Sequence, residues 1–184
     1  MIATIAKAFS VPEIRRKLLF AAAMLALYRL GAYIPAPGID VDAVKSLEEQ
    51  LTGSNILGFL NLFSGGSLSR LSLFALGIMP YITASIILQL LTVVVPSLER
   101  LQKEGEVGQQ KITQYTRYLT VALAAMQSLA YVFLFNSLSA GGQSVVSNMN
   151  LANVLLIVIC LTAGTTLLMW IGELITQRGI GNGI

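Results

Sequence analysis

Four apolar segments restrict the fold of this chain more than any other feature of its sequence. They cover residues 18–34, 71–95, 118–138 and 151–175. A helix crosses the hydrocarbon core of a bilayer with about 20 apolar residues, at a rise of about 1.5 Å per residue. Charged residues make up only 11% of the chain, whereas a soluble domain carries about 25%. The sequence therefore predicts an all-α, polytopic membrane protein with four spans.

The positions of lysine and arginine predict how these spans are oriented. Most of the cations gather before the first span, between the second and the third, and after the fourth: Lys7, Arg15, Arg16, Lys17, Arg100, Lys103, Lys111, Arg117 and Arg178. The connections 35–54 and 139–150 hold one cation, Lys45. Cytoplasmic loops carry the excess of Lys and Arg. We therefore expect these two connections to face outward, and the cytoplasmic parts to be residues 1–17, 96–117 and 176–184.

The residue types present disfavour several classes of function. The chain has no histidine and one cysteine, Cys160, so no intrachain disulfide and no cysteine–histidine metal cluster can form. Its net charge of +3 reflects a scarcity of acids rather than a nucleic-acid-binding face. No Asp, Glu or Lys lies in the middle of a span, which counts against ion-coupled transport. Glu173, at the inner end of the fourth span, is expected to be solvated or paired with Arg178.

The entrance to the second span is polar and rich in glycine. A short apolar stretch, 55–63, is followed by "SGGSLSR" at 64–70, and Gly and Ser at these positions release the backbone from helical geometry. Non-helical backbone is tolerated at membrane depth only where it is buried in protein or lines a water-filled cavity. Two interpretations stay open from the residues: a broken helix that enters such a cavity, or an amphipathic helix on the outer surface.

The second span also carries an isoleucine stripe beside a proline. Pro80 removes a backbone donor and Gly77 loosens the same turn, so we expect a kink in this helix. Ile78, Ile82 and Ile86 recur every four residues and share one face. Such a stripe either faces lipid or forms a hydrophobic constriction that closes a pore by dewetting.

Three stretches of the sequence closely resemble the bacterial SecY family of protein translocase subunits. They are "YIPAPGID", "FSGGSLSRLSLFALGIMPYITASIILQLLTVVVPSLERLQKEGEVGQQKITQYTRY" and "LLMWIGELITQRGIGNGI". The resemblance covers nearly the whole chain. It implies a channel of ten spans in two halves of five, of which this chain would supply spans one to four. The chain is thus expected to be the incomplete N-terminal half of a longer, SecY-type protein.

The resemblance also implies roles for particular residues. The pore ring of the family falls on Ile78 and Ile82, and its lateral gate on Thr83, Ile86 and Gln127. Its plug, a half-helix that blocks the closed pore from the outer side, maps to residues 55–70. The plug residues are Phe59, Leu60, Phe63, Ser64, Gly65, Gly66, Ser67 and Arg70. In this interpretation the stretch from Ser64 to Ser67 is flexible and lets the plug move.

The implied function is a protein-conducting channel in the bacterial cytoplasmic membrane. It would pass unfolded polypeptides across the membrane and membrane segments sideways into lipid, without catalysis, cofactor or metal. The implied partners are the SecE and SecG subunits, the SecA motor ATPase, the ribosome, signal sequences, nascent polypeptides and membrane lipid. Two other classes remain as alternatives: a small-solute secondary transporter with a broken helix, and a purely structural membrane anchor.

Overall fold

The described part of the chain is helical. The computed structural model describes residues 11–40, 42–44, 46, 64–68, 70–138, 145–146, 149–179, 181 and 183. Its helices are α2 Pro12–Gly31, α5 Met79–Val94, α6 Pro96–Lys103, α7 Glu106–Leu138 and α8 Leu151–Arg178. Within these ranges β pairing is confined to two isolated bridges, Pro35 with Ser72 and Ile39 with Val146. The predicted all-α fold is confirmed.

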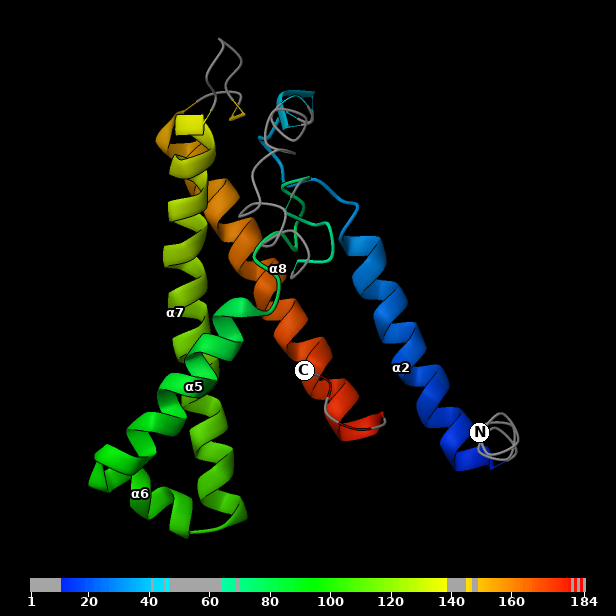
Figure 1. Cartoon of the computed structure of the whole chain (residues 1–184), viewed down its shortest axis with the longest axis vertical. Helices are drawn as coiled ribbons and strands as arrows, with labels where there is room; N and C mark the ends of the chain where they lie inside the picture. The colour runs from blue at the N-terminus through cyan, green and yellow to red at the C-terminus, as the bar shows by residue number, and fades with distance from the viewer. Residues whose placement is uncertain are drawn as a thin grey trace.

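The long helices α7 and α8 pack against each other, α2 lies on the side of α8 away from α7, and α5 crosses α7 (Figure 1). α2 packs on α8, whereas α5 and α6 pack on α7. The beginning of α2, the whole of α6 and the end of α8 lie toward the same end of the molecule (Figure 1). This arrangement brings together, at one end, six of the twelve lysines and arginines of the sequence: residues 15–17, Arg100, Lys103 and Arg178.

Two of the described helices, α7 and α8, are long and apolar enough to cross a membrane. The pair α5 and α6 meets the same criterion together, but the two helices are bent by 99° at their junction. If this pair is one span, the described residues hold up to three. α2 covers the first predicted span as far as Gly31 but carries charges at Glu13, at residues 15–17 and at Arg29. The first span therefore stays a prediction.

The helix of the second predicted span begins later than expected. Residues 71–78 form turns, in which Leu71 and Gly77 adopt positive φ angles of 42° and 59°, and α5 begins at Met79. Pro80 therefore lies in the first turn of a helix, where the missing N–H has no partner to lose. The predicted kink at Pro80 is wrong, because this proline starts a helix instead of bending one.

The predicted connection 96–117 is also largely helical. α6 begins at Pro96, after the extended residue Val95, and a turn with Gly105 at a φ of 73° leads into α7. α7 has 33 residues and is thus about 50 Å long, well beyond the roughly 30 Å of a hydrocarbon core. Its first three turns precede the apolar part that begins near Tyr118, so one rigid helix joins the connection to the third span.

The main hydrophobic core lies where the segment before α5 meets α7 and α8. We call residues 64–78 the entrance segment. Its buried side chains Leu68, Leu71, Ala75 and Leu76 pack with apolar residues of four other parts of the chain: Ala36, Ala43, Val44, Val132, Phe135, Val145, Val146, Val154, Ile157 and Leu161. The entrance segment is therefore an interior element of the fold.

Candidate functional site

Turns closed by hydrogen bonds form the entrance segment. The N–H of Ser67 donates to the carbonyl of Ser64 at 3.1 Å, and the N–H of Ser72 donates to the carbonyl of Ser67 at 3.0 Å. Ser67 and Ser72 are fully buried, and Ser64 is 4% exposed. The stretch from Ser64 to Ser67, expected to be flexible, is thus a packed and bonded turn. Of the predicted plug residues, Phe59, Leu60 and Phe63 lie outside the described residues.

The C-terminal end of α2 and the residues after it satisfy much of the polar backbone of this segment. The Tyr28 hydroxyl donates to the carbonyl of Ser64 at 2.9 Å, and Nη1 of Arg29 donates to the carbonyl of Gly65 at 3.0 Å. Two further backbone bonds join the segment to residues 34–36: Ala36 N–H to the Leu71 carbonyl at 3.0 Å, and Leu73 N–H to the Ile34 carbonyl at 2.9 Å. The described non-helical backbone of this segment is therefore bonded to other parts of the chain, and the water-filled cavity expected beside it stays a prediction.

Two glycines allow neighbouring helices to approach the segment closely. A Cβ on Gly164 of α8 would lie 2.0 Å from the carbonyl oxygen of Leu73, and a Cβ on Gly31 of α2 would lie 2.1 Å from the ring of Phe74. Neither glycine was singled out from the sequence, since a glycine in an apolar helix gives no sign of which distant segment it contacts. These two contacts hold the entrance segment between α2 and α8.

The two predicted ring residues lie at the start of α5. Ile78 is the N-cap residue, and its carbonyl accepts the N–H groups of Tyr81 and Ile82, both at 3.1 Å. Ile78 and Ile82 are thus one helical turn apart on the same face, and both are partly exposed. The entrance segment ends at Ile78, so the packing of this segment determines where the isoleucine face begins.

A pocket of about 400 Å³ lies beside the same stripe, between α5, α7 and α8. It is lined by Tyr81, Ile82, Ser85, Ile86, Thr113, Arg117, Glu173, Thr176 and Gln177. Ile82 and Ile86 therefore border a partly polar hollow within the described fold, although the Ile86 side chain is 51% exposed. The role of the stripe, in lipid contact or in a constriction, stays a prediction.

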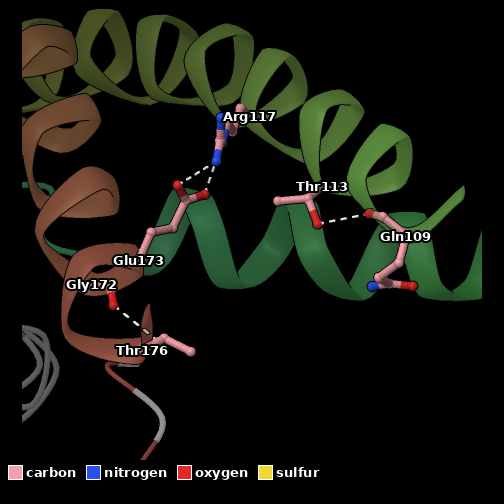
Figure 2. Close-up of polar contacts among 6 residues, drawn as sticks. All are labelled: Gln109, Thr113, Arg117, Gly172, Glu173 and Thr176. Atoms are coloured by element: carbon pink, nitrogen blue, oxygen red, sulfur yellow. Dashed lines mark hydrogen bonds and ion pairs between the residues drawn. The ribbon is translucent and has the colours of Figure 1, made fainter. Parts of the chain in front are cut away.

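A bidentate ion pair between Arg117 and Glu173 lines one side of this pocket. Nε of Arg117 donates to Oε1 of Glu173 at 2.8 Å, and Nη2 donates to Oε2 at 2.6 Å. Figure 2 shows the two side chains reaching toward each other from α7 and α8. The Glu173 side chain is only 12% exposed, against 45% for Arg117. Paired hydrogen bonds between opposite charges are among the strongest in proteins, so this contact ties α7 to α8.

The expected pairing of Glu173 with Arg178 is wrong. Both residues are on α8, five positions apart, so their side chains leave the helix about 140° apart. Side chains meet on a helix at spacings of three or four residues. Arg117 reaches Glu173 from another helix, and only a contact between distant segments could have revealed this partner.

The predicted gate residues lie on helices that touch each other, because α5 packs against α7. The Thr83 hydroxyl donates to the carbonyl of Met79 in its own helix at 3.0 Å. Gln127 is partly buried on α7. Both residues are described, and the structure has no hydrogen bond between them. The assignment of Thr83, Ile86 and Gln127 to a gate stays a prediction.

The sequence is similar to the SecY family and to its members over nearly the whole chain. The family model described as SecY matches residues 72–184, more than half of the chain. A protein translocase subunit SecY of Streptomyces galbus is 52% identical over 191 residues, which cover the whole chain and 44% of that protein. A subunit of the same name from Corynebacterium glutamicum is 51% identical over 185 residues, which cover 98% of the chain and 42% of that protein. The chain thus spans less than half the length of these relatives.

Solved structures of protein-conducting channels share the fold. Sec61 in the canine ribosome–channel complex aligns with 97% of this chain and 38% of its own, with a TM-score of 0.59 and 18% identity. A structure titled as that of a protein conducting channel gives the same values. At this level of identity the likeness concerns the arrangement of the helices alone.

Proposed function

This chain belongs to the SecY family, and we propose from that membership that it forms part of the protein-conducting channel of a Sec translocase. One structural observation supports the proposal most directly: non-helical backbone is packed between helices and leads straight to Ile78 and Ile82. A channel needs such an arrangement because irregular backbone must be shielded from lipid while it approaches a pore. We propose that the chain supplies the N-terminal part of the channel in the bacterial cytoplasmic membrane.

The distribution of charge supports an orientation with the N-terminus in the cytoplasm. The beginning of α2, α6 and the end of α8 lie toward one end of the molecule (Figure 1), and they carry residues 15–17, Arg100, Lys103 and Arg178. Cytoplasmic surfaces of membrane proteins are enriched in Lys and Arg. We propose that this end faces the SecA motor or the ribosome, and that SecE and SecG complete the channel.

Reconstitution into lipid vesicles tests this function against its alternatives. We expect vesicles that contain the assembled channel, with its motor and ATP, to take up an unfolded polypeptide that carries a signal sequence. A secondary transporter would instead move one small solute, and an anchor would move neither. Protection of the polypeptide from added protease measures uptake. Uptake of a small solute in the absence of any polypeptide uptake would contradict the proposal.

We further propose that Ile78 and Ile82 line the constriction of the channel. Branched aliphatic side chains close a pore by excluding water, so replacing both residues with serine should raise the resting ion conductance of reconstituted channels several-fold. Leu90 and Val93 of the same helix, which are 64% and 80% exposed, provide the control. Their replacement by serine should leave the conductance unchanged. If the Ile78 and Ile82 double variant is as tight as the wild type, these residues do not form the ring.

The lateral gate is proposed to involve Thr83, Ile86 and Gln127, on neighbouring helices. The Thr83 hydroxyl already has a partner in its own helix, whereas the amide of Gln127 offers polar groups to a facing helix. Polar contacts between membrane helices contribute about 0.6–2 kcal/mol. We therefore expect Gln127→Leu to lower the signal-sequence hydrophobicity needed for export, and Thr83→Val to change it less. Export of a series of signal sequences measures this threshold, and an unchanged threshold in Gln127→Leu would argue against the gate.

The plug is proposed to include residues 55–70, as the family resemblance implies. Among its described members, Ser64, Gly65 and Ser67 are packed against α2 and the core, and the guanidinium of Arg70 lies 4.5 Å from the centre of the Tyr33 ring. We propose that these described residues form the fixed base of the plug.

A further inference from the structure

One residue of α2, Tyr28, contacts the entrance segment at two places that are ten residues apart in the chain. Its hydroxyl donates to the carbonyl of Ser64 at 2.9 Å. Its ring stacks on that of Phe74, with 5.7 Å between the ring centres and 22° between the ring planes. The two contacts use different parts of the same side chain. Tyr28 thus closes the stretch from Ser64 to Phe74 into a loop fastened to α2.

Phe74 also contacts other residues of α2 and a residue of α8. It is 2% exposed, and its ring occupies the space that a side chain at position 31 would need, because a Cβ on Gly31 would lie 2.1 Å from it. Ala32 of the α2 end and Leu168 of α8 belong to the same buried cluster. A ring packed at interior density cannot shift without displacing its neighbours, so Phe74 has a fixed position between α2 and α8.

A short hydrogen-bonded turn connects Phe74 to Ile78. The N–H of Gly77 donates to the carbonyl of Phe74 at 2.8 Å, and Gly77 has a φ of 59°. The next residue is Ile78, the N-cap of α5. A turn closed by a hydrogen bond restricts how far its last residue can move relative to its first. The location of Phe74 therefore determines where α5 and its isoleucine face begin.

We propose that Tyr28 and Phe74 are positioning residues that set the location of Ile78 in the resting channel. Neither side chain lines the pocket beside the isoleucine stripe, so their effect acts through the entrance segment. Arg29 supports the same arrangement through its bond to the Gly65 carbonyl. The inference rests on the proposed function: if Ile78 lines the constriction, residues outside the constriction determine how tightly it closes.

Thiol modification at position 78 tests the inference in the assembled channel. Cys160 is first replaced by alanine, and Ile78→Cys then reports access to a charged, water-soluble thiol reagent. Tyr28→Phe removes the bond to Ser64 but keeps the ring, whereas Phe74→Leu removes the ring but keeps an apolar side chain. We expect Tyr28→Phe to raise the modification rate about two- to tenfold, the range that the loss of one hydrogen bond produces in an equilibrium. Phe74→Leu should raise it at least as much, because the smaller side chain leaves space in a buried cluster. The same changes, with Ile78 intact, should raise resting ion conductance.

Tyr118→Phe is the matched control. It also removes one tyrosine hydroxyl, which accepts a bond from Gln114 on the exposed surface of α7, and it should alter neither measurement. If replacing Ile78 and Ile82 with serine raises conductance while Tyr28→Phe and Phe74→Leu leave conductance and modification unchanged, the inference is overturned and the proposed constriction stands. If the serine variant has no effect, the constriction fails, and the modification rate alone decides whether Tyr28 and Phe74 position residue 78.

Discussion

Replacing Gly164 with alanine is expected to destabilise the protein by about 2–3 kcal/mol, at the upper part of the usual range for overpacking. The added Cβ would lie 2.0 Å from the carbonyl oxygen of Leu73 and 3.3 Å from its Cγ. The first of these atoms is backbone, so it cannot move aside as the end of a flexible side chain would. The neighbouring bond from Leu73 N–H to the Ile34 carbonyl would be strained by the same displacement.

The midpoint of thermal unfolding in detergent measures this loss. Ala163→Val is the control, since Ala163 is the preceding residue of α8 and is exposed, and the change adds more atoms than Gly164→Ala does. We expect the free energy of unfolding of the control to lie within about 0.5 kcal/mol of the wild-type value, as is usual for surface substitutions. A Gly164→Ala protein as stable as the Ala163→Val protein would show that the entrance segment does not press against α8 at this point.

The contact between Gly164 and Leu73 also shows what the sequence could and could not predict. Apolar length was enough to predict the helices α7 and α8, because the requirement to span a bilayer acts on each segment separately. Gly164 lies inside such a segment and has no local feature that marks it. Its role depends on a carbonyl 91 positions earlier in the chain, and no periodicity reports a contact of that kind.

The start of α5 shows a second limit of the same reasoning. Pro80 in an apolar run is compatible with a kinked helix or with a helix that begins nearby, and the surrounding residues favour neither. Gly77, at positive φ, decides between them, because it ends the turns of the entrance segment just before Ile78. The isoleucine spacing was still a sound guide, since Ile78 and Ile82 are one turn apart in the structure.

Family resemblance, rather than a residue pattern, gave the candidate site its proposed roles. The entrance segment ends at Ile78, one helical turn before Ile82, and the assignment of both residues to a pore ring stays a prediction. The residues that hold them, Tyr28 and Phe74, follow from neither source. The sequence did contain one sign of this contact, since Arg29 is a charge within an apolar helix and such a residue needs a polar partner. Its partners are the carbonyl of Gly65 and the hydroxyl of Tyr33.

Reversing the charge of either Arg117 or Glu173 is expected to destabilise the protein by about 1.5–3 kcal/mol or more. This range is the usual contribution of one hydrogen bond that involves a charged group. The loss should be larger for Glu173→Arg. The Glu173 side chain is 12% exposed, whereas that of Arg117 is 45% exposed, and placing a cation opposite Arg117 in a desolvated position adds repulsion to the lost bonds.

Combining Arg117→Glu with Glu173→Arg tests whether the two residues act as a pair. We expect the double variant to recover part of the stability, with a coupling free energy of about 1–3 kcal/mol from the double-mutant cycle. The recovery should be incomplete, because an exchanged arginine on α8 cannot reproduce the two bonds of 2.8 Å and 2.6 Å from the same direction.

The exchange of Lys103 and Glu99 is the matched control for this cycle. These residues form an ion pair within α6, and their side chains are 74% and 47% exposed. Solvent-exposed pairs of this spacing contribute about 0.3–0.5 kcal/mol, so their exchange should barely move the unfolding midpoint. If the Arg117 and Glu173 cycle shows no more coupling than this exposed pair, the contact between α7 and α8 depends on packing alone. A larger coupling would show that this ion pair holds α7, which carries Gln127, against α8.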